Sequence, residues 1–398
     1  QILSDLVILA ILALNFSSMG FTIGGFLSDR LKSPASDERS ISAPETIAFL
    51  QAEQLQGTSY PTTSWLTTPN SHAADSDLSA PNTPEKKSLP ASIAGPRKAV
   101  YDTFPTEGPV WANSSFNYRK AIRVDKEKIT GLSSLTNFPL LVEIYDKKMK
   151  DYTQASGNDI IFTDASGTRL AHEVDYYSKD YNTTHSRLLA WVKVPALSVT
   201  DDTFLWLYFG NSTLPNQETP QSVWTNGYVA VWHMNESPQT SQIIDSTSSG
   251  LNATSNGAMT ASDLVTGQIG LGIDFDGSDD RLIVGNIDSG AWTALTLQAW
   301  GYMRDTNDDR LISKEDTGAG ADAWSLGKNN ADLRYQISTD PSSTTTKIET
   351  CGCTSTLTWI QFGMTFDASL SSNELSGYSN GILRAQSSNS GTSIYDTS

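Results

Sequence analysis

Four aspartates gather in one short segment of the chain, Asp274-Phe275-Asp276-Gly277-Ser278-Asp279-Asp280. If the segment continues a strand, Phe275 points inward and Gly277 allows a tight turn directly after it. The carboxylates of Asp276, Asp279 and Asp280 then converge around one loop. Hard cations such as Ca²⁺ take about six to eight oxygen ligands of this kind. The segment therefore predicts a calcium site, and the alternative is a set of ordinary polar turn residues.

A second acidic run, Asp305 to Asp309, is predicted to be a solvated hairpin loop.

A second segment places carboxylates at alternate positions of a predicted strand: His172-Glu173-Val174-Asp175-Tyr176-Tyr177-Ser178. It is similar to the Glu-x-Asp-x-x-Glu strand of laminarinase-like hydrolases, in which alternate carboxylates on one face act as nucleophile and acid. Here Ser178 stands where the second glutamate would be. The outward polar face of a strand explains the segment better, so we predict no catalysis there.

Histidine and tryptophan offer less specific signals. The four histidines, His72, His172, His185 and His233, show no pair at metal spacing, and the sequence contains neither a Ser-His-Asp signature nor a Gly-rich phosphate loop. His233 is predicted to be structural. Five tryptophans fall within predicted strands and are predicted to be core residues: Trp191, Trp206, Trp232, Trp300 and Trp359. Trp292 and Trp324 lie near loops and are candidates for stacking against a sugar ring, with a packing role as the alternative.

The charge and the cysteines restrict the class of protein. The net charge is −17, and the 27 Lys and Arg residues form no dense cluster, which argues against a nucleic-acid partner and against docking on anionic lipid. Cys351 and Cys353 are separated by one residue, so a disulfide between them would be strained and two ligands would not complete a zinc site. We therefore interpret them as ordinary loop residues.

The first residues of the chain predict a membrane anchor. Residues 6–28 carry no charge, and as a helix they would extend roughly 34 Å, enough to cross a bilayer. The alternatives are a signal peptide and a processed, pilin-like N-terminus that packs into a filament. Together with its basic flank, the segment predicted as an anchor covers residues 1–32.

Residues 33–115 are predicted to form an extended, largely disordered stalk. They contain ten of the sixteen prolines, with Ser, Thr, Asn, Ala and Glu between them. Such a segment does not bury enough apolar surface to offset its chain entropy. The stretch that favours a short helix is residues 45–56.

The first globular module is predicted to be an antiparallel β-sandwich over residues 116–223. Its strands are expected at residues 121–124, 138–144, 159–162, 170–177, 188–194 and 204–209, and the Asp164–Gly167 turn is expected to join the third and fourth strands as a hairpin. The blocks YRKAIRVD, NFPLLVEI, DIIFTDASGT, HEVDYY, AWVKVPALS and TFLWLYFGN resemble the domain of unknown function 2341. That family has no assigned activity, and the resemblance implies a module of exported surface proteins of bacteria and archaea.

The second module, residues 228–398, resembles a laminin-G or concanavalin-like jelly roll. The resemblance is carried by YVAVWHMNE, the Asp245–Ala253 loop, GQIG and the Ile273–Asp280 segment, with further strands at 295–302, 310–314, 324–327, 333–337 and 359–366. It implies a carbohydrate-binding fold with one Ca²⁺ and suggests Asp245 as a further ligand. It also implies closing strands beyond Ser398. The fold class expected for the whole chain is therefore all-β, with two antiparallel sandwiches after an N-terminal helix and a linker.

Five Asn-x-Ser/Thr triplets agree with an exported glycoprotein. They begin at Asn113, Asn182, Asn211, Asn235 and Asn252.

We therefore expect a membrane-anchored cell-surface protein that recognises an extracellular glycan or a surface protein without catalysing a reaction. The alternatives are the targeting portion of a larger secreted polysaccharide-active enzyme and a pilin-like filament subunit. Fold analogy alone does not choose among these functions.

Overall fold

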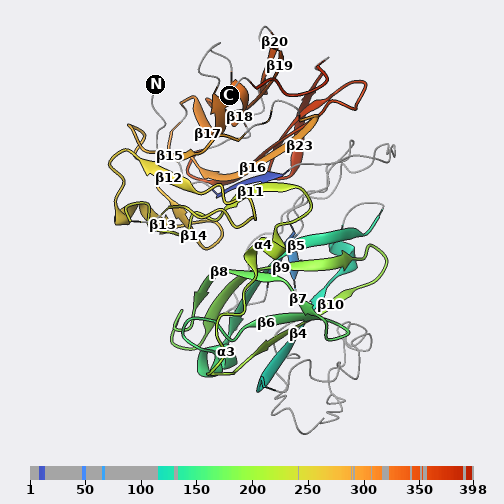
Figure 1. Ribbon diagram of the computed structural model, residues 1–398, viewed down its shortest axis with the longest axis vertical. Coiled ribbons are helices and arrows are strands. Elements are labelled where there is room, and N and C mark those ends of the chain that lie inside the picture. The colour runs from blue at the N-terminus through green and yellow to red at the C-terminus, as the bar shows by residue number, and fades with distance from the viewer. Residues whose placement is uncertain are drawn as a thin grey trace, which may run out of the picture. The chain divides into compact units, whose positions relative to one another are not determined.

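The computed structural model describes three short N-terminal strands and most of the chain from residue 115 onward. The described residues are 9–13, 47–50, 65–67, 115–129, 133–240, 242–287, 289, 292–305, 307–315, 322–340, 343–349, 352, 356–388 and 391–396. They are almost entirely β-structure in antiparallel sheets (Figure 1), which confirms the predicted all-β class. The chain divides into two compact units between Thr219 and Pro220. We call them the 115–219 unit, which includes residues 47–50 and 65–67, and the 220–396 unit, which includes residues 9–13.

The 115–219 unit is a sandwich of two sheets. One sheet has the order β4-β10-β6-β7 and the other β3-β2-β5-β9-β8. The strands are β2 (Ile47–Leu50), β3 (Trp65–Thr67), β4 (Tyr118–Val124), β5 (Leu135–Asp146), β6 (Ile161–Asp164), β7 (Arg169–Leu170), β8 (His172–Ser178), β9 (Ser186–Leu197) and β10 (Thr203–Phe209). A short helix, α3 (Lys147–Tyr152), follows β5 directly.

Strand alternation explains the core of this unit. In β5 the residues Leu140, Val142 and Ile144 are buried in one apolar cluster, and in β9 every second residue from Leu188 to Val194 joins the same cluster. Glu143 lies between two of these positions and Arg187 directly precedes Leu188, so both lie on the outward face of the five-stranded sheet.

The predicted hairpin at the Asp164–Gly167 turn is present but shorter than expected. Asp164 accepts hydrogen bonds from the backbone of Ser166 and Thr168, and Gly167 adopts a positive φ. The returning strand is divided: β7 pairs with β6, whereas β8 joins β9 in the other sheet. Residues 47–50 and 65–67, within the predicted stalk, form β2 and β3 on the edge of β5, so the helix suggested across 45–56 is wrong at 47–50. The rest of the predicted stalk up to residue 114 lies outside the described residues.

The 220–396 unit is also built around two stacked sheets. A six-stranded sheet has the order β11-β1-β16-β21-β22-β23, a four-stranded sheet has the order β17-β18-β19-β20, and two small ribbons pair β12 with β15 and β13 with β14. The strands are β1 (Leu9–Ala13), β11 (Tyr228–Trp232), β12 (Ala253–Asn256), β13 (Leu264–Thr266), β14 (Leu271–Ile273), β15 (Arg281–Val284), β16 (Ala294–Tyr302), β17 (Asp309–Glu315), β18 (Asp322–Asn329), β19 (Asp332–Asp340), β20 (Ser343–Glu349), β21 (Trp359–Asp367), β22 (Leu375–Ser379) and β23 (Ile382–Ser387). A single helical turn, α4 (Pro220–Val223), precedes β11.

The core of this unit lies between its two large sheets. In β21 every second residue from Ile360 to Phe366 is buried in it, and Trp324, Leu326, Tyr335 and Ile337 enter it from the four-stranded sheet. This packing of two antiparallel sheets agrees with a jelly-roll-like architecture.

The predicted membrane helix over residues 6–28 lies mostly outside the described residues. Residues 9–13, which are described, form the strand β1 between β11 and β16. Among the described residues, no helix has the length and apolar character needed to cross a bilayer. Cys351 and Cys353 also lie outside the described residues.

Candidate metal centre

The three aspartates predicted to converge lie together on the loop between β14 and β15. One carboxylate oxygen from each of Asp276, Asp279 and Asp280 lies within 4.8 Å of the others. Two oxygens bound to opposite sides of one Ca²⁺, at about 2.3–2.6 Å each, are separated by about 5 Å. The spacing of the three carboxylates therefore fits ligation of a single calcium ion.

The local fold explains why these side chains meet. Phe275 is buried in the core of the 220–396 unit, as predicted, which anchors the start of the loop. Gly277 has φ +75 and reverses the chain. Backbone N–H groups of Ser278 and Asp279 donate to Asp276 Oδ1 at 2.7 and 3.4 Å, and the N–H of Asp276 donates to Asp280 Oδ2 at 3.1 Å.

The electrostatics of the loop favour a cation. Burial raises the pKa of the Asp280 carboxyl, and the nearby charges of Asp276, Asp263 and Asp279 raise it further. Asp280 is 5 % exposed, so its charge has little water around it. The pKa of Asp276, by contrast, is lowered by the hydrogen bond from the Ser278 N–H. A divalent cation would relieve the mutual repulsion of these carboxylates.

Asp245 is not part of this group. Its buried carboxylate accepts hydrogen bonds from the N–H groups of Val231, Thr247 and Leu251 and from the Thr247 hydroxyl, at 2.9–3.0 Å. The side chain therefore organises its own loop, and the structure does not place it beside the calcium candidates.

The two tryptophans predicted to contact sugar have different positions. Trp324 is 1 % exposed, belongs to the core and donates from Nε1 to Ser289 Oγ at 3.1 Å, so of the two alternatives given for it, sugar stacking and packing, the structure shows packing. Trp292 is partly buried against the edge of the core. Its backbone N–H donates to Ser289 and its carbonyl accepts from Ile394.

Two tryptophans predicted to be core residues lie elsewhere. Trp300 follows Leu295, Leu297 and Ala299 in β16, and because those residues fill the core, Trp300 lies on the opposite face of the sheet. By the same alternation Trp359 lies on that face too, and its ring centroid is 5.6 Å from that of Tyr302. Trp232 is a core residue as predicted, while Trp191 and Trp206 are buried outside the main core of their unit.

The other candidate side chains have structural partners. Trp191 Nε1 donates to Asp175 Oδ2 at 2.9 Å, which gives the Glu173–Ser178 strand a packing role. His233 is 3 % exposed and its ring lies beside Trp224.

The predicted solvated loop at Asp305–Asp309 is wrong for its last residue. Asp309 is 1 % exposed and forms an ion pair with Lys328, which is fully buried, at 2.8 Å. The register places Asp309 opposite Lys328 in the β17–β18 ladder, so the two charges enter the interior as a pair.

The sequons differ in how their amide groups are used. Asn182 is exposed, and within the part of the chain that the structure describes only its Oδ1 is engaged, by Thr184 and His185. Asn211 donates from Nδ2 to the Ser115 carbonyl, and Asn252 donates from Nδ2 to Gln242 Oε1 at 3.4 Å. Asn235 is partly buried, and Asn113 lies outside the described residues.

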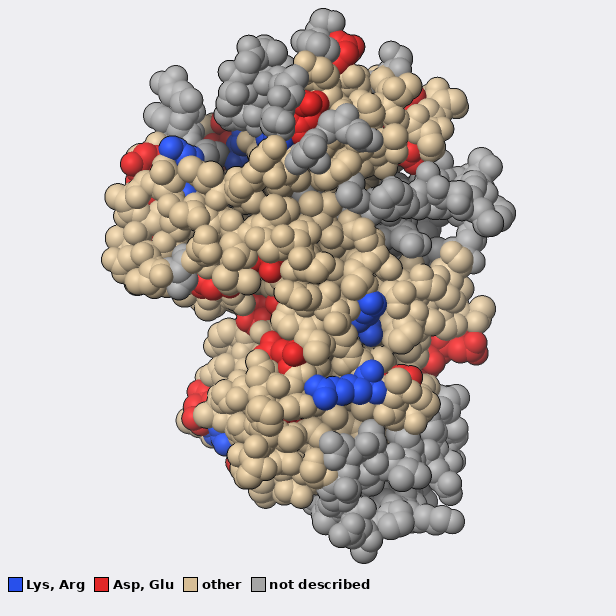
Figure 2. All heavy atoms as spheres, viewed as in Figure 1, with Lys and Arg blue, Asp and Glu red and all other residues tan. Residues whose placement is uncertain are grey.

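Basic side chains are sparse on the face drawn in Figure 2. Lys and Arg occur there as small, separated groups among neutral residues, with acidic groups between them. This distribution agrees with the acidic composition of the chain.

The comparisons with known proteins point to one family. No curated protein and no solved structure matches the chain. The matching family segment begins before β6 and ends at the first residue of β16, so it starts and ends further along the chain than the predicted 116–223 module. Residues 156–294 match the family described as a domain of unknown function, DUF2341.

Proposed function

We propose that this chain is a non-catalytic recognition protein of a cell surface and that its 220–396 unit binds carbohydrate with the help of Ca²⁺. The observation that supports this proposal best is the convergence of Asp276, Asp279 and Asp280 within 4.8 Å on one loop. Calcium held there would fix the loop and offer open coordination positions to sugar hydroxyls. The resemblance of residues 228–398 to laminin-G and concanavalin-like domains supports the same proposal.

The remaining parts of the proposal concern location. The sequons and the acidic composition agree with an exported protein. The partner is then an extracellular glycan or a glycosylated surface protein.

Calcium titration of the 398-residue chain tests the metal site. We expect heat release and a higher melting temperature with CaCl₂ than with EDTA, because an ion that binds only the folded state stabilises it. Asp276→Asn combined with Asp279→Asn should abolish both effects. Asp308→Asn is the matched control, since Asp308 is an exposed aspartate outside the group, and it should leave them unchanged.

A glycan array run with calcium and with chelator tests the recognition function. Retention of one class of sugar that is lost both with EDTA and in the double variant supports the proposal. Calcium binding without any glycan retention by the folded chain would contradict the carbohydrate part of it.

A further inference from the structure

A cluster of tyrosines surrounds one arginine on the outward face of the five-stranded sheet. Arg187 on β9 lies directly opposite Tyr145 on β5. Its guanidinium carbon lies 5.6, 5.7 and 5.5 Å from the ring centroids of Tyr145, Tyr176 and Tyr181, within the range of about 6 Å over which a cation attracts an aromatic ring. Tyr181 is 43 % exposed. We call Glu143, Tyr145, Tyr176, Tyr181 and Arg187 the tyrosine cluster.

Glu143 places a hydrogen-bond acceptor beside the donor groups of Arg187. Glu143 Oε1 accepts from Arg187 Nε and from the Tyr145 hydroxyl, each at 2.8 Å. Burial and the adjacent Glu143 raise the pKa of Tyr145, so that its hydroxyl remains a donor. Within the described part of the chain, neither Glu143 Oε2 nor the terminal nitrogens of Arg187 make a hydrogen bond. One acceptor and two donors thus lie next to three aromatic rings, with Glu143 6 % exposed and the Arg187 side chain 19 % exposed.

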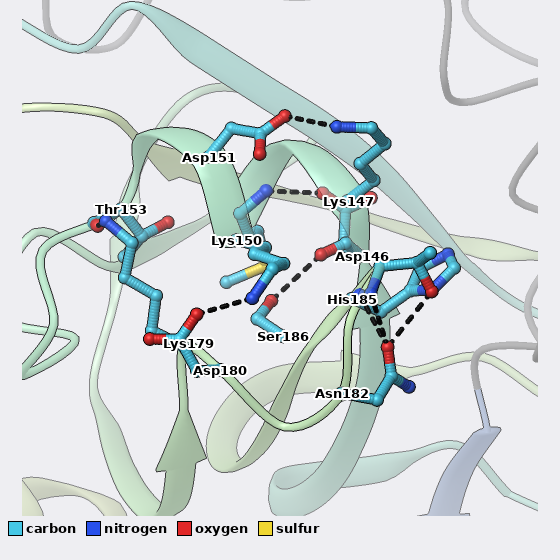
Figure 3. A network of polar contacts seen from close by, with 12 residues as sticks. Asp146, Lys147, Lys150, Asp151, Thr153, Lys179, Asp180, Asn182, His185 and Ser186 are labelled. Carbon is cyan, nitrogen blue, oxygen red and sulfur yellow. Dashed lines mark hydrogen bonds and ion pairs between the residues drawn. The ribbon is translucent and has the colours of Figure 1, made fainter.

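The hairpin that carries Tyr181 is held in place by α3 (Figure 3). Lys150 of α3 pairs with Asp180, and Lys179 Nζ donates to the Thr153 carbonyl at 2.6 Å. On the other side of Tyr181, the Asn182 side chain accepts from the backbone of Thr184 and His185 at 2.8 Å. Because both neighbours of Tyr181 are fixed, a ligand would not have to order the hairpin, which favours binding.

We propose that the tyrosine cluster binds a neutral hexose unit of a polysaccharide. A pyranose ring offers an apolar C–H face, which suits the Tyr181 ring, and neighbouring hydroxyl groups, which would bond to Arg187 and to Glu143 Oε2. Glu143 balances the charge of Arg187, and the net charge of −17 repels polyanions. These charges favour a neutral glycan over an acidic one.

This site is separate from the calcium site of the proposed function. The cluster belongs to the 115–219 unit and the aspartates Asp276, Asp279 and Asp280 to the 220–396 unit. Sugar binding at the cluster should therefore persist in EDTA and in the Asp276→Asn/Asp279→Asn variant. Failure of one proposal does not imply failure of the other.

Titration calorimetry of the full chain, produced in a host without N-glycosylation, tests the proposal. The probes are neutral hexaoses with glucose, mannose or galactose backbones, and polygalacturonate as the acidic comparison. We expect one neutral series to bind in EDTA. Tyr181→Ala and Arg187→Met should each weaken its binding at least tenfold, since a lost charge-assisted bond or ring contact of about 1.4 kcal/mol has that effect.

Two controls separate a binding role from a structural one. Tyr181→Phe keeps the ring and should bind as the parent does. Tyr152→Ala removes a tyrosine of similar exposure, 49 % against 43 % for Tyr181, that stacks on Tyr118 outside the cluster, and should also leave binding unchanged. Binding that survives Tyr181→Ala and Arg187→Met, binding of polygalacturonate alone, or no binding by a chain with parental melting behaviour would each overturn the proposal.

Discussion

The ring of Tyr335 on β19 lies directly against the α-carbon of Gly377 on β22. A Cβ added at Gly377 would be 2.2 Å from Tyr335 Cε1, and the Tyr335 ring is fully buried. Gly377→Ala should therefore destabilise the 220–396 unit by about 1–3 kcal/mol through overpacking. Gly285→Ala is the control, because a Cβ there meets nothing within 4 Å. Urea unfolding curves measure both, and equal midpoints for the two variants would contradict the prediction.

Removing either Lys328 or Asp309 alone should destabilise the protein much more than removing both. Their side chains are 0 % and 1 % exposed, so removing one partner leaves a charge in a site with little water. We expect Lys328→Met or Asp309→Leu to lower the free energy of unfolding by about 3–5 kcal/mol, and the double variant Lys328→Met/Asp309→Leu to recover much of that loss. Arg310→Gln, which removes a partner of the exposed Asp308, should change it by less than about 1 kcal/mol. A double variant as unstable as the sum of the two single variants would disprove the coupling.

His172 should make the 115–219 unit sensitive to mild acid. Burial, followed by the charge of Arg169, lowers its pKa to about 4 in the folded chain, against about 6.5 when unfolded. Between pH 6.5 and 4 the unfolded chain binds a proton that the folded chain does not, so stability is lost as the pH falls. The loss should be about 1.4 kcal/mol per pH unit, about 3 kcal/mol in all.

The difference between unfolding curves at pH 7 and pH 4.5 measures this effect. His172→Leu should reduce that difference by about 2–3 kcal/mol relative to the parent. His185→Gln should leave it unaltered, because His172 is still present. A His172→Leu chain with the full parental acid sensitivity would show that other groups are responsible.

Asn182 should be the most fully occupied glycosylation site among the described sequons. It is exposed at the tip of the β8–β9 hairpin, and its Oδ1 carries the local hydrogen bonds while its Nδ2 makes none within the described residues. Sugar attaches to Nδ2, so the turn is preserved. Peptide mass spectrometry of protein from a glycosylating host should show higher occupancy at Asn182 than at Asn211 or Asn252. Thr184→Ala should remove the glycan, and preferential occupancy of Asn252 would refute the argument.

The sequence predicted the strands better than the directions of their large side chains. The alternation of β21 and the inward position of Phe275 were readable because apolar residues recur at every second position. The same alternation assigns Trp300 to the outward face, since Leu297 and Ala299 occupy the core positions before it. The general preference of tryptophan for interiors led to the wrong prediction that Trp300 is a core residue. The alternation of its neighbours along the strand was the better guide.

The contacts that depend on register could not be predicted. Lys328 and Asp309 meet because of one strand pairing, and Arg187 meets Tyr145 because of another. Asp276, Asp279 and Asp280 were identified because they are neighbours in the sequence. The role of Asp245 required knowing which backbone N–H groups surround it.

The complete burial of Lys328 has a practical use. Amine-acylating reagents modify lysines at the surface of a native protein, and a lysine ammonium surrounded by Asp309, Asp305 and the Asn307 carbonyl will react only when the β17–β18 hairpin opens. The rate at which Lys328 is labelled therefore measures how often the four-stranded sheet opens, and mass spectrometry can follow it on the unmutated chain.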